Sequence, residues 1–170
     1  DQETASIATN AALTGHILLS TLHANDAPSA FTRLLDLQVP PFLIASTINI
    51  ILGQRLVRKI CASCTTPKSL TKAELASLQG TFSAAALNKV RTFFAGRGCE
   101  RCNNSGYEGR VGIQEVLGVS EAIRSAIMQR ANASDIKKIA LSEGMVPMLE
   151  DGLSKAAQGI TTIEEAAHSV

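Results

Sequence analysis

Four cysteines are the residues of this sequence whose spacing most clearly predicts chemistry. They form two Cys-x-x-Cys pairs, Cys61 with Cys64 in "CASC" and Cys99 with Cys102 in "CERC", and the sequence has no other cysteine. Each pair can present two thiolates on one side of a tight turn, and two pairs complete the tetrahedral shell of a structural zinc ion. The spacing therefore predicts one zinc ion held by all four cysteines.

Two other uses of paired cysteines remain open from the sequence. The pairs could be redox-active dithiols, although no thioredoxin-like context surrounds them, or they could form two disulfides, which require an oxidising compartment. The stretch between the pairs, residues 65–98, is longer than in compact zinc ribbons and must accommodate a helix. Gly106 and Gly109, which follow the second pair, fit the tight turn after a metal-binding knuckle.

Two histidines flank an apolar run in "LTGHILLSTLHAND". The run is short and ends at turn-prone residues, which favours a strand over residues 16–22. The side-chain period of two then places His16 and His23 on opposite faces, whereas a helix would place both on one face, as a metal pair requires. Ligands of open α/β sheets gather at the carboxyl ends of strands, so His23 is the stronger candidate for a functional site. The alternative for either histidine is a structural role at a strand end.

Composition limits the class of protein to which the chain can belong. The 170 residues are 45% apolar, enough for a hydrophobic core, and a net charge of +1 argues against a dedicated nucleic-acid-binding protein. The uncharged stretch over residues 40–53 is too short to span a bilayer and is expected in a buried helix. The chain opens at Asp1 without an initiator methionine, so we expect it to be a fragment of a longer protein.

The order of expected elements predicts an α/β fold with a partly parallel sheet. Strands are expected over residues 16–22 and 110–117. Capping boxes are expected at Thr71 with Glu74 and at Thr161 with Glu164, each at the start of a helix. The other expected helices cover residues 3–13, 28–37, 39–60, 120–130, 134–143 and 146–158.

Four segments resemble one family. The first, "DQETASIATNAALTGHILLSTLHANDAPSAFTRLLDL", is similar to the region just after the acidic Walker B strand in the secretion ATPases of type II secretion and type IV pili, including their histidine box. The other three are "GQRLVRKICASC", "GCERCNNSGYEGRVGIQEVL" and "MLEDGLSKAAQGITTIEEA". A tetracysteine motif generally separates the secretion and pilus-extension members of this family from the retraction members, which places this chain with the former.

The resemblance implies a fold and an activity. The fold would be the C-terminal portion of a RecA-like P-loop ATPase core (residues 1–60), an inserted tetracysteine zinc-binding subdomain (61–109), and a strand with a C-terminal helical subdomain (110–170). The whole protein would bind ATP and Mg²⁺ and work as a homo-hexamer on the cytoplasmic face of the inner membrane, with a membrane platform protein as its partner. Because the sequence contains no GxxxxGK[ST] phosphate loop, the chain alone is expected to be inactive.

The resemblance also implies roles for single residues. His23 would lie near the γ-phosphate as a hydrogen-bond donor, and His16 is a second candidate from the same motif. Asp1 and Glu3 look like the end of the acidic segment that organises magnesium and the attacking water, although both could be solvated residues at a helix start. Arg110 would lie close to the nucleotide base.

A second function of a different class remains open. The chain could be a stand-alone zinc-bearing protein-interaction module without catalysis. This alternative explains the four cysteines, but it leaves the histidine box without a role.

Overall fold

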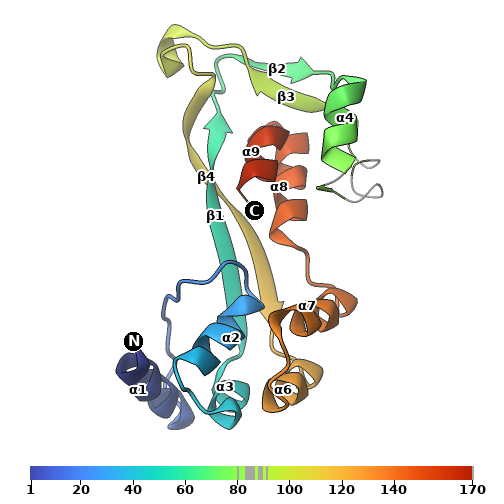
Figure 1. The fold of residues 1–170 in the computed structure, drawn as a ribbon. Coiled ribbons are helices and arrows are strands. Elements are labelled where there is room, and N and C mark those ends of the chain that lie inside the picture. Colours follow the sequence, from blue (N-terminus) through green and yellow to red (C-terminus); the bar gives the residue numbers. More distant parts are fainter. Residues whose placement is uncertain (80, 83–86, 88–89, 91, 170) are drawn as a thin grey trace. The chain divides into compact units, whose positions relative to one another are not determined.

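The computed structural model describes residues 1–79, 81–82, 87, 90 and 92–169, which fold into two compact units. The first comprises Asp1–Gly53 and Glu115–Val146, and the second comprises Gln54–Gln114 and Pro147–Val170. The chain passes from the first unit to the second within strand β1 (Ile50–Ile60) and returns within strand β4 (Tyr107–Gly118). These two strands pair with each other and run in opposite directions (Figure 1).

The first unit packs short helices around one apolar core. Its helices are α1 (Gln2–Leu13), α2 (Ser29–Asp36), α3 (Pro41–Thr47), α6 (Glu121–Met128) and α7 (Ala133–Ser142). The side chains of Ser120 and Asn132 accept hydrogen bonds from backbone N–H groups of the first turns of α6 and α7, so both helices begin at a cap. The core cluster includes Phe31, Ile44, Leu117, Ile123, Ile127 and Ile136.

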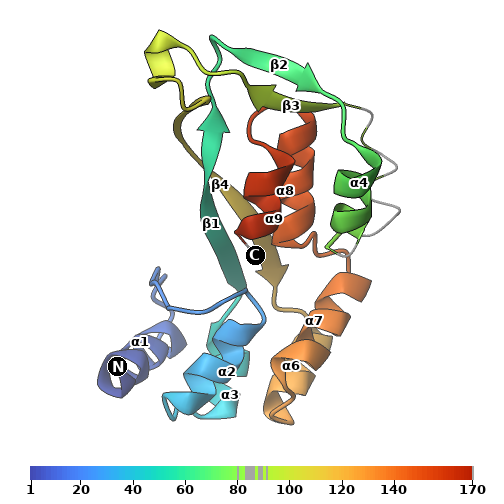
Figure 2. The ribbon, with the colours of Figure 1, turned by 45° about the horizontal axis from the view of Figure 1, so that its top comes forward.

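The second unit holds the cysteine pairs and the C-terminal helices. Its remaining elements are β2 (Thr65–Lys68), α4 (Lys72–Gln79), β3 (Phe93–Gly96), the 3-10 helix η1 (Glu100–Cys102), α8 (Met148–Ala157) and α9 (Ile163–His168). Strands β2 and β3 are antiparallel, with Thr65 opposite Gly96 and Lys68 opposite Phe93. Helices α8 and α9 lie side by side (Figure 2), and they share a core with β3 through Phe93, Leu153 and Ile163.

Most of the short elements expected from the sequence are confirmed. The first two expected helices form as α1 and α2, the helices after residue 120 form as α6 to α9, and β4 includes the expected strand over residues 110–117. At the start of α4, the Glu74 carboxylate accepts from the Thr71 backbone N–H at 2.7 Å, and the Thr71 hydroxyl accepts from the Glu74 N–H at 3.2 Å. The last cap differs by one residue, because the hydroxyl of Thr162 accepts from the Glu165 N–H.

The long helix expected over residues 39–60 is wrong. Helix α3 ends at Thr47, and the chain continues as β1 from Ile50. The run "INII" is rich in β-branched residues, which favour strands, and pairing with β4 satisfies the backbone of β1. Arg55, Arg58 and Lys59 therefore lie in a strand rather than at the end of a helix.

The strand expected over residues 16–22 is not formed either. The segment has no regular secondary structure and belongs to neither of the two sheets formed by the described residues, so its backbone makes no hydrogen-bond ladder with a strand. Its apolar side chains are consequently open to solvent, with Ile17 96% and Leu19 94% exposed. The expected partly parallel sheet is also absent from the described part of the chain, whose two sheets are antiparallel. No helix among the described residues is long and apolar enough to cross a membrane.

Candidate functional site

The four cysteines converge in the second unit. All four Sγ atoms lie within 4.8 Å of one another. The distance is 3.8 Å from Cys61 to Cys99, 3.9 Å from Cys64 to Cys102 and 3.7 Å from Cys99 to Cys102. A tetrahedral ion bound to four sulfurs at about 2.3 Å sets those sulfurs about 3.8 Å apart. The cluster therefore has the dimensions of a four-thiolate metal site.

Local backbone turns present the sulfurs to one another. In each pair the second cysteine donates its N–H to the carbonyl of the first, at 3.2 Å for both Cys64 to Cys61 and Cys102 to Cys99. Two consecutive residues after Cys102, Asn103 and Asn104, adopt left-handed backbone conformations, as metal knuckles require for a tight reversal. All four cysteines are free thiols in the structure, so neither pair forms a disulfide.

Backbone N–H groups aimed at sulfur make one cysteine acidic. Burial raises the pKa of Cys102, but the N–H groups of Cys99 and Gly106, at 3.2 and 3.3 Å from its Sγ, outweigh burial and lower that pKa to about 6. Burial raises the pKa of Cys64 to about 11. Only a bound cation would hold all four groups as thiolates near neutral pH, because four thiolates repel one another.

Charged and aromatic groups fix the strands that flank the cysteines. Arg101 pairs with Glu108 at 2.9 Å, and a Glu108 oxygen lies 3.6 Å from the Sγ of Cys61. On β1, which ends just before Cys61, the guanidinium of Arg58 lies 4.1 Å from the ring centroid of Tyr107 and 2.6 Å from a Glu165 oxygen. These contacts tie β1, β4 and the start of α9 together within the second unit.

The segment that carries the two histidines lies in the first unit. The side chains of His16 and His23 are both exposed. The Nδ1 atom of His16 lies 2.9 Å from the Thr14 hydroxyl, whereas His23 makes no hydrogen bond or ion pair with any described residue. The structure thus leaves the ring of His23 available to a ligand.

The residues just after His23 are firmly held. Asp26 and Ser29 form reciprocal hydrogen bonds, from the Ser29 N–H to the Asp26 carboxylate at 3.0 Å and from the Asp26 N–H to the Ser29 hydroxyl at 3.1 Å. The ammonium group of Lys137, from α7, lies 3.2 Å from the same carboxylate. Burial raises the pKa of Asp26, but these bonds and the lysine lower it overall.

The other predicted site residues are spread over the two units. Asp1 caps α1 by accepting the Thr4 N–H at 2.8 Å, and Glu3 is an exposed residue of the first helical turn. Arg110 is exposed on β4 in the second unit, just after Gly109, whose φ is +75°. The structure brings the four cysteines together, but it does not bring Asp1, His16 or His23 into contact with one another.

One buried carboxylate was missed by the sequence analysis. Glu115 of β4 is 3% exposed, and its Oε1 accepts the backbone N–H of Ala27 at 2.6 Å. The signal was present in the sequence, since Ile113, Glu115 and Leu117 occupy one face of a strand and both apolar neighbours are fully buried. A glutamate in such a series requires a specific partner.

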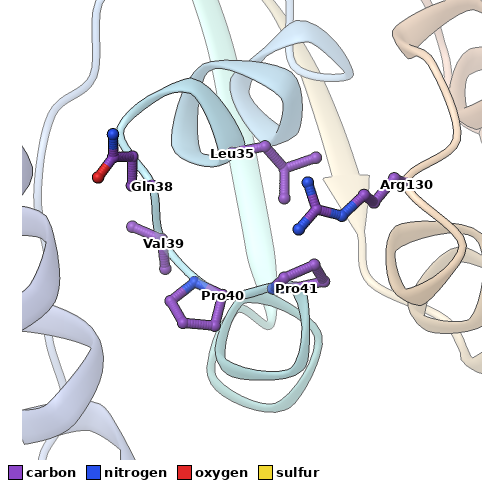
Figure 3. Close-up of a pocket in the computed structure, with 6 residues that line it drawn as sticks. All are labelled: Leu35, Gln38, Val39, Pro40, Pro41 and Arg130. Carbon is purple, nitrogen blue, oxygen red and sulfur yellow. The ribbon is translucent and has the colours of Figure 1, made fainter.

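A shallow pocket of about 300 Å³ in the first unit contains none of the predicted site residues. Figure 3 shows the guanidinium of Arg130 near Leu35 and Pro41 at this pocket. The pocket is lined by Leu35, Gln38, Val39, Pro40, Pro41 and Arg130.

Residues 1–168 match the family described as Type II/IV secretion system protein. The chain is 47% identical over 165 residues to the type IV pilus assembly ATPase PilB of Thermus thermophilus, an alignment that covers 97% of this chain and 18% of that protein. It is 41% identical over 165 residues to the type II secretion system protein E of Dickeya dadantii, covering 97% of this chain and 32% of that protein. The chain thus spans less than a third of the length of either relative.

Two solved structures share the fold. The crystal structure of the pilus retraction motor PilT with bound ADP has a TM-score of 0.62 at 22% identity, covering 100% of this chain and 37% of that one. The structure of the ATPase DotB of Legionella pneumophila has a TM-score of 0.58 at 20% identity, covering 98% of this chain and 35% of that one. Structural likeness at this identity establishes the fold alone.

Proposed function

The chain belongs to the family of type II/IV secretion system proteins, and from this membership we propose that it is the C-terminal part of a hexameric ATPase that powers type II secretion or type IV pilus assembly. The observation that carries the proposal is the 47% identity to a pilus assembly ATPase over nearly the whole chain. The residues before Asp1 in the full-length protein would supply the phosphate loop, and ATP and Mg²⁺ would bind there. The protein would act on the cytoplasmic face of the inner membrane, against a membrane platform protein.

The proposed division of the chain follows these roles. Residues 1–60 would belong to the RecA-like ATPase core, residues 61–109 to a zinc-binding subdomain and residues 110–170 to a strand with a C-terminal helical subdomain. The identity to the pilus assembly ATPase of Thermus thermophilus supports placing the chain within an ATPase.

Zinc is the metal that best fits the cysteine cluster. Four sulfur donors within 4.8 Å of one another, with three of the pairs at 3.7 to 3.9 Å, match tetrahedral zinc, and no described His, Asp or Glu joins the group. Because four protein ligands close the shell, such an ion would stabilise the fold and leave no position for a substrate. Cys61, Cys64, Cys99 and Cys102 would each contribute one thiolate.

His23 is the proposed catalytic residue of this chain. Its exposed ring, without a partner among the described residues, can donate an N–H to a phosphate oxygen as charge develops there. His16 would play a secondary part, since its Nδ1 already lies against the Thr14 hydroxyl. Asp1 and Glu3 would contribute carboxylates toward magnesium and water, and Arg110 would contact the nucleotide base.

An ATPase assay on two proteins tests the proposal. The full-length protein should hydrolyse ATP in the presence of Mg²⁺, and the isolated 170 residues should show no turnover above background and only weak nucleotide binding. Robust turnover by the isolated chain, after removal of contaminating ATPases, would refute the assignment of the phosphate loop to upstream residues. A full-length protein that binds zinc but has no ATPase activity would favour the zinc-bearing interaction module instead.

A further inference from the structure

Glu115 is the only charged residue among the buried residues of the described chain. A carboxylate that loses water on burial is costly unless hydrogen bonds replace its hydration. The carboxylate meets the backbone of a segment far away in sequence, since it accepts the Ala27 N–H at 2.6 Å. The residues on either side of Glu115 on the same face of β4, Ile113 and Leu117, are buried and apolar. A glutamate between them indicates a specific role.

The space around this carboxylate depends on a glycine. A Cβ atom on Gly53 of β1 would lie 3.0 Å from Cγ and 3.1 Å from Oε1 of Glu115, and 3.2 Å from the Ala27 nitrogen. These separations are tighter than ordinary van der Waals contacts. Because Gly53 has no side chain, β1 can pack closely against the place where Glu115 of β4 accepts the Ala27 N–H.

The bond lies close in the sequence to the proposed catalytic residue. Ala27 is four residues after His23, and Asp26 between them is held by Lys137 at 3.2 Å. The chain is thus fixed at two consecutive residues, by a carboxylate from β4 and an ammonium group from α7. On the other side of His23, the side chains of Ile17 and Leu19 are almost fully exposed.

We propose that Glu115 is a positioning residue for the reaction of the full-length protein: its carboxylate fixes the Ala27 N–H and thereby the end of the segment that carries His23, four residues earlier. This inference rests on the proposed role of His23. Glu115 does not touch the reacting atoms in this account. Its effect comes from geometry, because a catalytic group displaced by about 1 Å can lose about 100-fold in rate.

The hydrogen bond defines the variants that test the proposal. Glu115→Ala removes the acceptor, Glu115→Gln retains a carbonyl oxygen of the same reach, and Gly53→Ala keeps the carboxylate but crowds it. Glu121→Ala is the matched control, because it removes a glutamate of the same unit whose side chain is 95% exposed. All variants are made in the full-length protein.

Steady-state ATPase assays and hydrogen exchange give the two readouts. Glu115→Ala should lower kcat by about 10 to 100-fold with little change in the KM for ATP, while Glu115→Gln should stay within about 3-fold of wild type. The kcat of Gly53→Ala should lie between the values of these two variants, and the kcat of Glu121→Ala should match that of wild type. Amide exchange of the peptide that contains Ala27 should accelerate in Glu115→Ala but not in Glu115→Gln.

A double variant separates this inference from the proposed function. If Glu115 acts through His23, Glu115→Ala should slow a His23→Ala enzyme by less than about 2-fold. The inference would be overturned, and the role of His23 left intact, by either of two results. One is a double variant whose kcat falls by the product of the two single-variant losses, and the other is wild-type turnover of Glu115→Ala. Wild-type turnover of His23→Ala would overturn the role of His23 and the inference with it. Equal losses of kcat in Glu115→Ala and Glu115→Gln, matched by equal falls in melting temperature, would show that Glu115 has only a structural role.

Discussion

The ammonium group of Lys137 lies 3.2 Å from the carboxylate of Asp26, which links α7 to the turn before α2. The other carboxylate oxygen of Asp26 accepts the N–H of Ser29, the first residue of α2. One aspartate thus bonds both the start of α2 and a lysine of α7, and it anchors the residues that follow His23.

The two contacts of the Asp26 carboxylate predict an ordered series of stabilities. Asp26→Ala removes both the acceptor of the Ser29 N–H and the lysine pair, and it should lower the free energy of unfolding by about 1 to 2 kcal/mol. Asp26→Asn keeps an oxygen that can accept the Ser29 N–H and should lower it by less than half as much, because the partly exposed ion pair contributes little. Urea denaturation of both variants measures the difference. Equal losses of unfolding free energy would show that the charge of Asp26, rather than its hydrogen bond to Ser29, carries the effect.

The same carboxylate predicts a dependence of stability on pH. The bonds from Ser29 and Lys137 outweigh burial and hold the pKa of Asp26 below its ordinary value of 3.8 in the folded state. A depressed pKa stabilises the fold above about pH 4, and this contribution disappears as the pH falls through the folded-state value. The difference in unfolding free energy between wild type and Asp26→Asn should therefore be constant from pH 5 to 7 and shrink below pH 4. A difference that stayed unchanged down to pH 3 would contradict this assignment.

The cysteine cluster predicts one zinc ion per chain. Elemental analysis of protein purified without chelator should find that ratio, and Cys99→Ser should lose most of the zinc, because one of four ligands is removed. Hydrogen exchange should then accelerate over residues 61–64 and 99–109. Ser63→Ala, which changes a non-ligand residue between two cysteines, should retain the metal. Protein without zinc, or full occupancy in Cys99→Ser, would argue against the site.

Close packing of α8 on α9 predicts a penalty at Gly152. A Cβ atom there would lie 2.9 Å from the Cβ of Ala166, so Gly152→Ala should destabilise the fold by about 1 kcal/mol even though alanine favours helices. The double variant Gly152→Ala with Ala166→Gly removes the Cβ of Ala166 and so makes room for the new methyl group. It should recover part of the lost stability. Thermal melts compare the two proteins. A single variant more stable than wild type would show that the helices separate readily.

The elements predicted well from the sequence are those determined by nearby residues. Ser120 and Asn132 cap their own helices, and the Thr71 and Glu74 box lies within four positions. The convergence of the cysteines was predictable for another reason, since two Cys-x-x-Cys turns have few uses other than one shared ion. In these cases the local pattern and the tertiary fold agree.

The errors arose where distant pairing decides the structure. The run over residues 39–60 is apolar enough for a buried helix, and only its pairing with β4 makes the second half a strand. Residues 16–22 show the opposite case, a strand-like pattern without a neighbouring strand among the described residues. Glu115 was missed because its partner, Ala27, lies 88 positions away in the sequence.

The ATPase activity of His23→Ala in the full-length protein shows whether His23 takes part in the reaction. We expect kcat to fall by about 10 to 1,000-fold, the range for losing one positioned donor, while nucleotide affinity, zinc content and melting temperature change little. His16→Ala, assayed beside it, should cost less in rate and more in stability. Unchanged turnover in His23→Ala, or a loss explained entirely by unfolding, would contradict the proposed role of His23.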